Sequence, residues 1–536
     1  MNLADPPCRE ASLDEVRAGT GYDAVVIGGG ATGGLAAEQL TEAGRRVLLL
    51  DAGYRKPLGE APVGRIVSGF TRLAARPALQ RALPYRALVL GQKVLRGAAR
   101  FRQPVQSQCY AWPSAPDAFV DDIDNPYETP PRQPYRWVRV RQLGGRMIVP
   151  AHGKQYYRHS EVDFSPPDAP GWPVDYDEIA PWYDLVERKL GLSGRRESSR
   201  WIPDSRIETT IAPNPLQSIL LDRLAERYPS YTPILGRHAL PRPSVEIAAR
   251  TGLLGLRKGA VVRSLQLTEA GAVAGVNFVD ARSGAEIFAP ASAVFLCASA
   301  FESTRILMNS SAERHSTRFP APSPALGRYI TDHISAKIEG TLRDRRVAGV
   351  RIRTEPEHCI CLPRFDTRTA AQGVSSGGFG LRMYLFGGGR GTCHFVAVSD
   401  AELEPRDTNR LVLSERRDRW NIPALRIDCR HGARDAAVFG QQVEALRELV
   451  ELFDIETDIS DLAPSVPGAS IHECGGARMG TDPSASVLDA RNRPWGVKGL
   501  YVTDGAAFPA IGIQNPTLTM MALTARACDF HIRATA

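Results

Sequence analysis

Two segments near the C-terminus carry side chains with the chemistry to handle a proton. His472 stands in IHECGGARMG, close to the glycine pair Gly475 and Gly476. An imidazole titrates near neutral pH, so it can act as a general base on a bound hydroxyl. The same pattern also fits a tight glycine turn that happens to be flanked by a histidine. Asn515 follows some forty residues later, and its amide can donate or accept a hydrogen bond.

A glycine turn near the N-terminus has the spacing of a dinucleotide site. Gly28, Gly30 and Gly33 form a G-x-G-x-x-G pattern that includes Thr32. Such glycines permit a tight turn, a close approach of the backbone to a pyrophosphate, and close packing of helix on strand. Asp51 follows at the distance expected for an acid that binds a ribose hydroxyl. The pattern alone fits FAD and NAD equally well.

The elements around this turn are those that a nucleotide fold needs. The apolar run 23–27 predicts a buried parallel strand, the residues after Gly33 predict a helix, and 47–50 predict a second strand. Near the C-terminus, 499–503 predict a strand that is followed by Asp504 and Gly505, and 515–532 show helical spacing of apolar residues. A second strand–acid–helix unit so far from the first favours a large flavoprotein over an NAD dehydrogenase.

The start of the last helix allows two interpretations of Asn515. Asparagine is a preferred N-cap, and Pro516 suits the first helical position. Asn515 is therefore predicted to cap the helix, to contact a substrate with its amide, or to do both.

The middle of the chain predicts further strands and helices. Alternating segments over 258–300 predict strands, 301–309 a helix, 350–430 further strands, and 433–452 a long helix. A chain of 536 residues exceeds the usual limit of one domain. These patterns predict an α/β protein.

Composition excludes several classes of protein. The nine cysteines include no CxxC pair, which argues against a zinc module or a disulfide framework, and no metal site is expected. No stretch reaches the ~20 apolar residues of a membrane span, and the N-terminus lacks the apolar run of a secretory signal. The small positive net charge of +7 is weak evidence for an anionic partner, so no nucleic acid partner is expected. A cytoplasmic location follows as the default expectation.

An arginine-rich segment lies at 65–102, and the stretch 61–116 contains no acidic residue. Apolar residues are interleaved with the arginines, which is typical of an amphipathic helix. The segment is interpreted either as a solvated helical insertion or as a docking face for an acidic partner or a membrane surface.

Six segments together resemble the glucose–methanol–choline (GMC) oxidoreductase family. They are VVIGGGATGG with LLLDAG, RQLGGR with YYRHSEVDF, VFLCASAFESTRILMNSS, LGRYITDH, HECGGARMGTDP and GLYVTDGAAFPAIGIQNPTLT. The likeness covers most of the chain after residue 22. Two further stretches, DDIDNPYETPPRQPYRW and GWPVDYDEIAPWYDLVERKLGLSG, are most similar to the branch that contains pyranose oxidase, glucoside 3-dehydrogenase and paromamine 6′-dehydrogenases.

The resemblance implies a fold and a division of the chain. It implies a Rossmann-type FAD-binding domain together with a discontinuous α+β substrate-binding domain built on an antiparallel sheet. The expected FAD-binding domain comprises 21–165, 231–325 and 465–536, and the expected substrate-binding domain comprises 166–230 and 326–464, with 1–20 as an N-terminal extension.

The resemblance also implies roles for single residues. In such a flavoprotein the flavin N5 takes a hydride from the alcohol carbon, while His472 takes the proton and Asn515 aims the hydroxyl. The remaining positions that match the family's FAD contacts are Gly144, Gly145, Val262 at the adenine, Asp504 and Gly505 along the ribityl chain, and Pro516 and Thr517 at the flavin ring. His333 lies in a family motif but is equally well explained as a buried, hydrogen-bonded residue. FAD is expected to bind non-covalently, and a covalent link through His152 is the less favoured alternative.

The substrate is expected to be a sugar-like alcohol. A glycoside or pyranose and an aminoglycoside-type metabolite, as in aminoglycoside biosynthesis, both fit the branch. An aminated substrate calls for carboxylates near His472, and the candidates are Asp121, Asp122, Asp124 and Glu128. Oxidation of a non-sugar alcohol or an amine is the alternative. Oxygen, a quinone and another electron carrier are all open as electron acceptors.

Overall fold

The computed structural model describes most of the chain. Its described residues are 9–19, 21–54, 94, 97, 100–149, 154–166, 171–312, 323–343, 359–369, 378–387, 392–460 and 462–535. His152 and most of the arginine-rich segment 65–102 lie outside these ranges, so their predicted roles stay predictions.

A parallel sheet forms the nucleotide-binding half of the molecule. Its strand order is β18-β10-β1-β2-β6, and every neighbouring pair is parallel. The strands are β1 (Ala24–Ile27), β2 (Val47–Asp51), β6 (Leu254–Lys258), β10 (Val294–Leu296) and β18 (Leu500–Val502). All residues of β1, β2, β10 and β18 are buried, as the continuous apolar runs in the sequence predict for a sheet covered on both faces.

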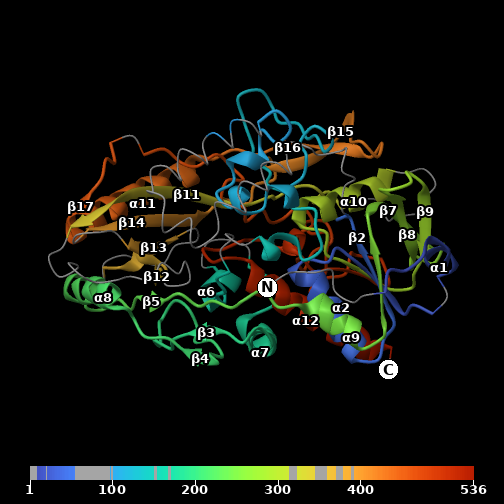
Figure 1. Ribbon diagram of the computed structural model, residues 1–536, viewed down its shortest axis with the longest axis horizontal. Coiled ribbons are helices and arrows are strands. Elements are labelled where there is room, and N and C mark those ends of the chain that lie inside the picture. Colours follow the sequence, from blue (N-terminus) through green and yellow to red (C-terminus); the bar gives the residue numbers. More distant parts are fainter. Residues whose placement is uncertain are drawn as a thin grey trace.

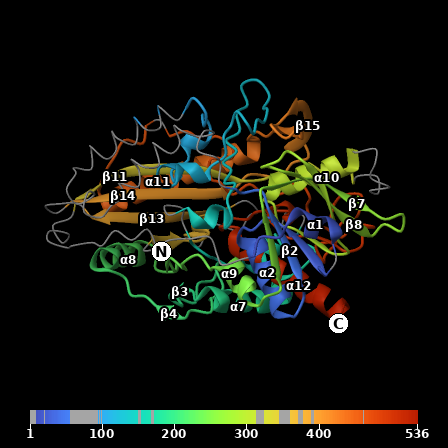
Figure 2. The same ribbon diagram turned by 45° about the vertical axis from the view of Figure 1, so that its right-hand side comes forward.

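Helices pack around this sheet and bring distant segments together. Helix α2 (Ala31–Glu42) contacts both α9 (Ser244–Arg250) and α12 (Thr517–Ala534). Helix α12 also contacts α7 (Tyr176–Leu190), and Figures 1 and 2 show α2, α9 and α12 side by side. The first and last predicted units of the chain are thereby joined in one domain core.

A six-stranded sheet forms the other half, with the order β17-β11-β14-β13-β12-β5. Its long strands are β11 (His333–Arg343), β13 (Phe379–Gly387) and β14 (Thr392–Glu402), and its short ones are β5 (Ile234–Leu235), β12 (Cys359–Leu362) and β17 (Ile455–Glu456). All of its pairings are antiparallel.

The two faces of this antiparallel sheet differ in polarity because side chains alternate along each strand. Ile334, Ala336 and Ile338 of β11 belong to an apolar cluster that also includes residues of α11 (Ala433–Phe453). The intervening Ser335 and Lys337 point to the opposite face, which lines a cavity. Helix α11 therefore buries one face of the sheet and leaves the other for ligand contacts (Figure 1).

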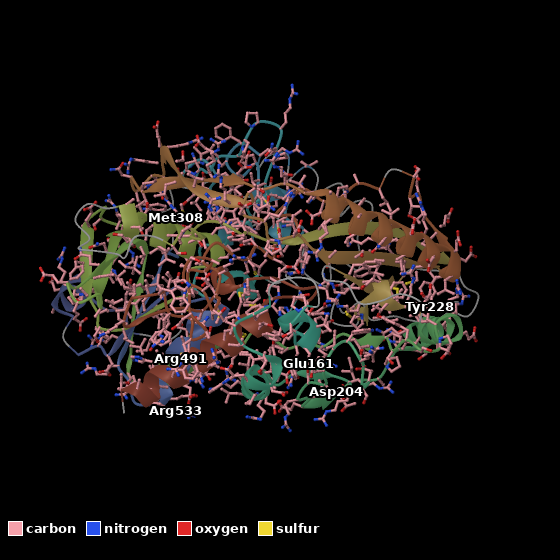
Figure 3. All side chains as sticks on the ribbon, turned by 180° about the vertical axis from the view of Figure 1, so that it is seen from behind. Glu161, Asp204, Tyr228, Met308, Arg491 and Arg533 are labelled. Carbon is pink, nitrogen blue, oxygen red and sulfur yellow. The ribbon has the colours of Figure 1, made fainter. Side chains whose placement is uncertain are left out.

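The remaining elements complete an α/β fold. Strands β7 (Ala260–Leu267), β8 (Val273–Asp280) and β9 (Glu286–Pro290) form an antiparallel sheet beside the parallel one. The other elements are α1 (Leu13–Ala18), α6 (Glu161–Phe164), α8 (Pro215–Arg227), α10 (Ala300–Ala312), the parallel pair β3 (Ser193–Gly194) with β4 (Thr209–Thr210), and the hairpin β15 (Arg410–Arg417) with β16 (Pro423–Asp428). The molecule is elongated, with Tyr228 near one end of its long axis (Figure 3).

The predicted α/β class, with a parallel sheet and an antiparallel sheet, is confirmed by the strand pairing. The chain passes repeatedly between the two sheets, since β5 follows β2 and β18 follows β17. The domain boundaries stay a prediction. No helix among the described residues is long and apolar enough to cross a membrane.

Candidate active site

A cavity of about 990 Å³ lies between the two large sheets. One end is lined by the glycine turn after β1, the end of β2 and part of β7. The middle is lined by 471–473, by 504–505 and by the start of α12. The polar face of the antiparallel sheet closes the other end through β11, β13 and β14. One continuous space therefore joins the predicted nucleotide site to the predicted base.

Most of the residues predicted from the sequence share this cavity. The lining includes Gly28, Gly30, Thr32, Asp51, Gly145, Val262, His472, Asp504, Gly505, Asn515, Pro516 and Thr517. Gly33 and Gly144 lie outside the lining. A Cβ atom on Gly33 would lie 1.8 Å from the carbonyl oxygen of Gly28, so Gly33 allows α2 to pack on the turn. The N–H of Gly144 donates to the carbonyl oxygen of Gly29 at 2.9 Å and so supports the turn from outside.

The glycine turn leaves room for a ligand beside an uncapped helix start. At Gly30, a Cβ atom would meet no heavy atom within 4 Å, so this backbone faces open space in the cavity. Helix α2 begins directly after Gly30, and no side chain caps its first turn. Backbone N–H groups at a helix start, with the positive end of the helix dipole, form an anion site suited to a pyrophosphate.

Asp51 is held at the end of β2 by backbone donors. Its two carboxylate oxygens accept hydrogen bonds from the N–H groups of Gly29 and Gly53, both at 2.7 Å. Burial raises the pKa of Asp51 above its ordinary value, while these two hydrogen bonds oppose the rise. Each carboxylate oxygen has a further lone pair, so Asp51 retains the capacity to accept from a ribose hydroxyl.

The start of α12 also faces the cavity. Pro516 and Thr517 line it, and no side chain caps the helix. The interpretation of Asn515 as the N-cap is wrong, because Pro516 occupies the N-cap position and the side chain of Asn515 contacts Arg382 instead. The short amide side chain is drawn away from the helix by the guanidinium across the cavity. The uncapped helix start presents positive potential to any anion bound there.

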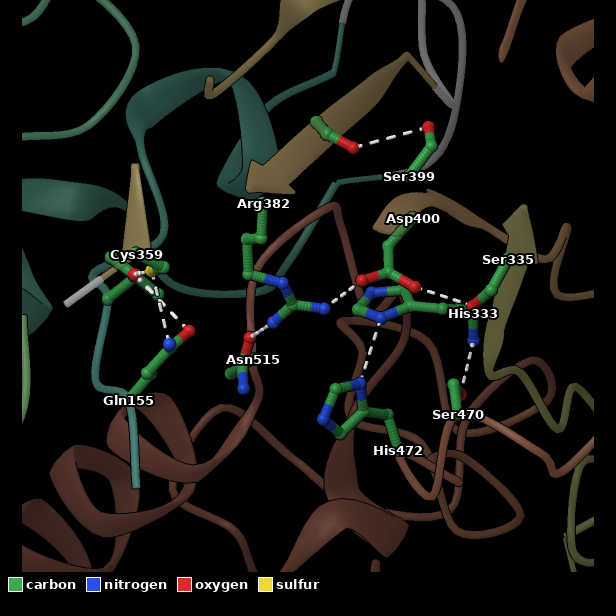
Figure 4. Close-up of polar contacts among 12 residues, drawn as sticks. Gln155, His333, Ser335, Cys359, Arg382, Ser399, Asp400, Ser470, His472 and Asn515 are labelled. Carbon is green, nitrogen blue, oxygen red and sulfur yellow. Dashed lines mark hydrogen bonds and ion pairs between the residues drawn. The ribbon is translucent and has the colours of Figure 1, made fainter. Parts of the chain in front are cut away.

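His472 is linked to a second, buried histidine. Its Nδ1 lies 3.0 Å from Nδ1 of His333 (Figure 4). Nε2 of His333 lies 3.1 Å from the carbonyl oxygen of Gly512. A carbonyl oxygen only accepts, so Nε2 of His333 carries the hydrogen. Burial lowers the pKa of His333 to about 3, so the ring is neutral near pH 7 and its Nδ1 is an acceptor. Nδ1 of His472 must then donate, so the neutral form of His472 carries its lone pair on Nε2.

This tautomer is the one that a general base needs. His472 lines the cavity, and in Figure 4 its Nε2 lies on the side where the amide of Asn515 lies. His333, which sequence reasoning left between a structural and a functional role, is buried and hydrogen-bonded, and it also fixes the proton position on His472. A neutral His472 whose lone pair is on Nε2 can accept a hydroxyl proton without changing its bond to His333.

Asp332 accepts hydrogen bonds from the backbone of both histidines. Its Oδ1 accepts from the backbone N–H of His333 at 2.8 Å and of His472 at 3.2 Å, and from the hydroxyl of Ser470. Burial raises the pKa of Asp332 to about 7. Hydrogen bonds to the backbone of both histidines fix the spacing of the two imidazole rings.

The neutral state of His333 predicts a pH effect on stability. An unfolded histidine takes up a proton below about pH 6.5, whereas the folded chain does so only near the lowered pKa of about 3. The contribution of His333 is therefore present above pH 6.5 and is lost as the pH falls towards 3. His333→Asn should remove this acid-side loss, measured as the change in urea midpoint between about pH 7.5 and about pH 5.

Asp332 contributes to stability with the opposite sign over an overlapping range. Its raised pKa makes its contribution fully present below about pH 3.9 and lost as the pH rises through about 7. Because the variant and the wild type share Asp332, their difference isolates His333. Parallel midpoints for the two proteins across this range would contradict a neutral buried His333.

A polar group on the antiparallel sheet was not predicted from the sequence. Arg382 of β13 donates to Oδ1 of Asn515 and to Asp400 of β14, and the hydroxyl of Ser335 on β11 donates to Asp400 at 2.5 Å (Figure 4). Arg382 stands between the buried residues Leu381 and Met383. That alternation in GLRMYLFG is a sequence signal for one polar sheet face, but the signal does not show what the polar face meets.

Other candidates lie away from the cavity. Among the described residues, the lining contains none of the carboxylates proposed for an aminated substrate. Asp121 and Asp124 pair with Arg102, Asp122 accepts from the N–H of Val105 at 2.9 Å, and Glu128 binds the hydroxyl of Ser414. These acids fix the loop 117–135 rather than contact the space beside His472.

Comparison with known proteins supports the predicted resemblance to the GMC oxidoreductases. The family model described as GMC oxidoreductase matches residues 405–524. Paromamine 6′-oxidase of Streptomyces fradiae is 25% identical over 94% of this chain and 89% of its own length. The 2-methyl-1,2-propanediol dehydrogenase of Mycolicibacterium austroafricanum is 24% identical over 70% of this chain and 78% of its own.

The fold is shared with solved structures as well. Pyridoxine 4-oxidase superposes with a TM-score of 0.62 at 19% identity, over 95% of this chain and 99% of that protein. The matched domain, the relatives that are similar over most of their length and the shared fold lead to one conclusion. Residues 405–524 form a C-terminal domain of the GMC oxidoreductase type, and the relatives that match most of the chain are oxidases and dehydrogenases, so the chain is an oxidoreductase that acts on CH–OH groups.

Proposed function

We propose that the protein oxidises a hydroxyl group of a neutral, sugar-like substrate to an aldehyde or ketone, with FAD bound non-covalently. The observation that carries this proposal is the linked pair His333 and His472, because His472 lines the cavity that Asn515 also lines and that reaches the glycine turn.

The two residues at the cavity have complementary hydrogen-bonding roles. Nε2 of His472 is an acceptor, and the Oδ1 of Asn515 is engaged by Arg382, which turns the NH₂ group of Asn515 towards substrate. An alcohol can donate its O–H to His472 and accept from Asn515 at the same time. As the proton moves to His472, the amide of Asn515 stabilises the negative charge that develops on the oxygen.

The residues present fit FAD. Bound FAD supplies a hydride acceptor for the alcohol carbon. The glycine turn, Asp51 and the start of α2 would hold its dinucleotide part, and Val262 would contact the adenine. The start of α12 at Pro516 and Thr517 would face the flavin ring. The positive end of the helix dipole would there stabilise the anionic reduced flavin by up to roughly 2 kcal/mol.

The carboxylates of the cavity favour a neutral substrate over an aminated one. Those in the described lining are Asp51, Glu302, Asp400, Glu473 and Asp504. Glu473 is paired with Arg146 at 2.5 Å, Glu302 with Arg305 at 3.2 Å, and Asp400 with Arg382. Asp51 and Asp504 accept from backbone or hydroxyl donors. An ammonium group would have to compete with these donors for every carboxylate.

Anaerobic reduction of the bound flavin tests this function. The purified yellow protein is mixed without oxygen with neutral glycosides and pyranoses, aminoglycosides, aliphatic alcohols and primary amines. We expect neutral glycosides or pyranoses to bleach the flavin fastest and at the lowest concentration, because they place several hydroxyls on the polar sheet face without an unpaired cation. Bleaching only by amines, or by none of the compounds, would contradict the proposal.

A further inference from the structure

We propose that Arg382 is a positioning residue that fixes the orientation of the Asn515 amide. This inference rests on the proposed function and adds a role for a residue of the antiparallel sheet. Arg382 donates to Oδ1 of Asn515 from one guanidinium nitrogen and to Asp400 from the other (Figure 4). The contact joins β13 to the segment before α12, far apart in the sequence.

The chemistry of the guanidinium decides which end of the amide faces it. Arginine has N–H donors and no acceptor, so a rotated amide would bring the NH₂ group of Asn515 against another donor. The oxygen of Asn515 therefore faces Arg382, and the two N–H donors of the amide face the other way. In Figure 4 the nitrogen of Asn515 points away from Arg382.

A second layer holds Arg382 in place. Its partner Asp400 has a side chain only 5% exposed, and the side chain of Arg382 is 15% exposed. Ser335 of β11 donates to the other oxygen of Asp400 at 2.5 Å. Strand pairing puts Ser335 directly opposite Asp400, so the sheet register itself sets the position of the guanidinium.

The consequence is a fixed polarity at the alcohol site. With the amide locked, Asn515 is a donor to the substrate oxygen and cannot present its carbonyl oxygen there. A donor is what a developing alkoxide needs, whereas an acceptor in the same place would repel it. The hydrogen bond to His333 makes Nε2 of His472 the acceptor for the alcohol proton. The hydrogen bond from Arg382 makes the NH₂ group of Asn515 the donor to the alcohol oxygen.

A double-mutant cycle between Arg382 and Asn515 tests this role. The rate of anaerobic flavin reduction at saturating substrate, and the substrate Kd, are measured for Arg382→Met, Asn515→Leu and the double variant. We expect Asn515→Leu to lower the rate about 100-fold and Arg382→Met to lower it about 10- to 30-fold. In the Asn515→Leu background, Arg382→Met should lower the reduction rate less than about threefold, because the amide that Arg382 orients is absent.

A second set of variants distinguishes loss of the positioning contact from loss of the fold. Arg382→Met leaves Asp400 as a buried carboxylate without its cation, which is destabilising. In Arg382→Met/Asp400→Asn both charges are removed, so the fold should persist while the amide is still released. Arg382→Lys keeps the positive charge on a single donor nitrogen and should recover part of the rate. Arg416→Met, on the exposed part of β15, is the matched control and should leave the rate unchanged.

The outcomes separate the two proposals. Rates that fall independently, so that the Arg382 effect is as large without Asn515 as with it, would overturn the positioning role while leaving alcohol oxidation intact. An effect confined to Kd would overturn it too, because a donor to the developing charge acts on the reduction rate. Wild-type flavin that no alcohol reduces would overturn the proposed function itself.

Discussion

Replacing His472 with glutamine is expected to slow anaerobic flavin reduction by the alcohol substrate about 10²- to 10⁴-fold. Glutamine is polar and of similar length, so it can fill the place of the ring. It has no basic nitrogen, so the side chain at this position cannot take the hydroxyl proton. The residual rate should rise with pH, because solvent hydroxide increasingly substitutes for the lost base. Stopped-flow absorbance of the flavin band measures the rate.

A matched control separates the loss of the base from a general effect of removing a histidine. His431 precedes α11 and is absent from the cavity lining, so His431→Gln should reduce its flavin at the wild-type rate. Flavin content should be the same in wild type and His472→Gln, since His472 does not hold the dinucleotide end. A His472→Gln rate within threefold of the wild type would exclude His472 as the base.

Replacing Gly30 with valine is expected to give a folded protein with less than about one tenth of the wild-type flavin. Gly30 has φ −78° and ψ −156°, a conformation that any residue can adopt. A Cβ atom there meets no neighbour within 4 Å, so the apoprotein should keep its fold. The branched side chain would instead fill the space where a pyrophosphate approaches the backbone.

Flavin released into the supernatant by acid precipitation measures this loss, and full release from the wild type supports non-covalent binding. Thermal unfolding of both apoproteins checks the fold. Gly440→Ala, in α11 with open space around it, should retain full flavin. Gly33→Ala should instead damage the fold, because its Cβ would lie 1.8 Å from a backbone oxygen. Wild-type flavin content in Gly30→Val would place the dinucleotide elsewhere.

Helices and strands were predictable where the spacing of apolar residues and glycines within one segment sets the backbone conformation. The strand at β1, the turn at Gly28 and the start of α2 follow from an apolar run that ends in glycines, because the backbone conformation there depends on the residues themselves. Gly28 has φ +94°, and a Cβ atom would lie 2.4 Å from the carbonyl oxygen of Cys297. Likewise the predicted helix 433–452 matches α11, Ala433–Phe453, within one residue.

The contacts across the cavity were not predictable in the same way. Asn515 shows the difference, since its type and its neighbour Pro516 indicate a helix cap, yet its side chain binds Arg382 on another sheet. A hydrogen bond to a charged donor is stronger than the local hydrogen bond that a helix cap makes, so the contact with Arg382 decides where the Asn515 side chain lies. The sequence pattern around Arg382 indicates a polar face and says nothing of its partner.

The sequence by itself determined the nucleotide turn with its flanking strand and helix, because these depend on residue type and spacing within a short segment. The antiparallel sheet and His472 as the candidate base were implied by the resemblance of several segments to the GMC family. Only the tertiary structure decided the tautomer of His472, the orientation of Asn515 and the partners of the cavity carboxylates. Those properties depend on which donors and acceptors meet across the cavity, where β11, β13 and the start of α12 come together from separate parts of the chain.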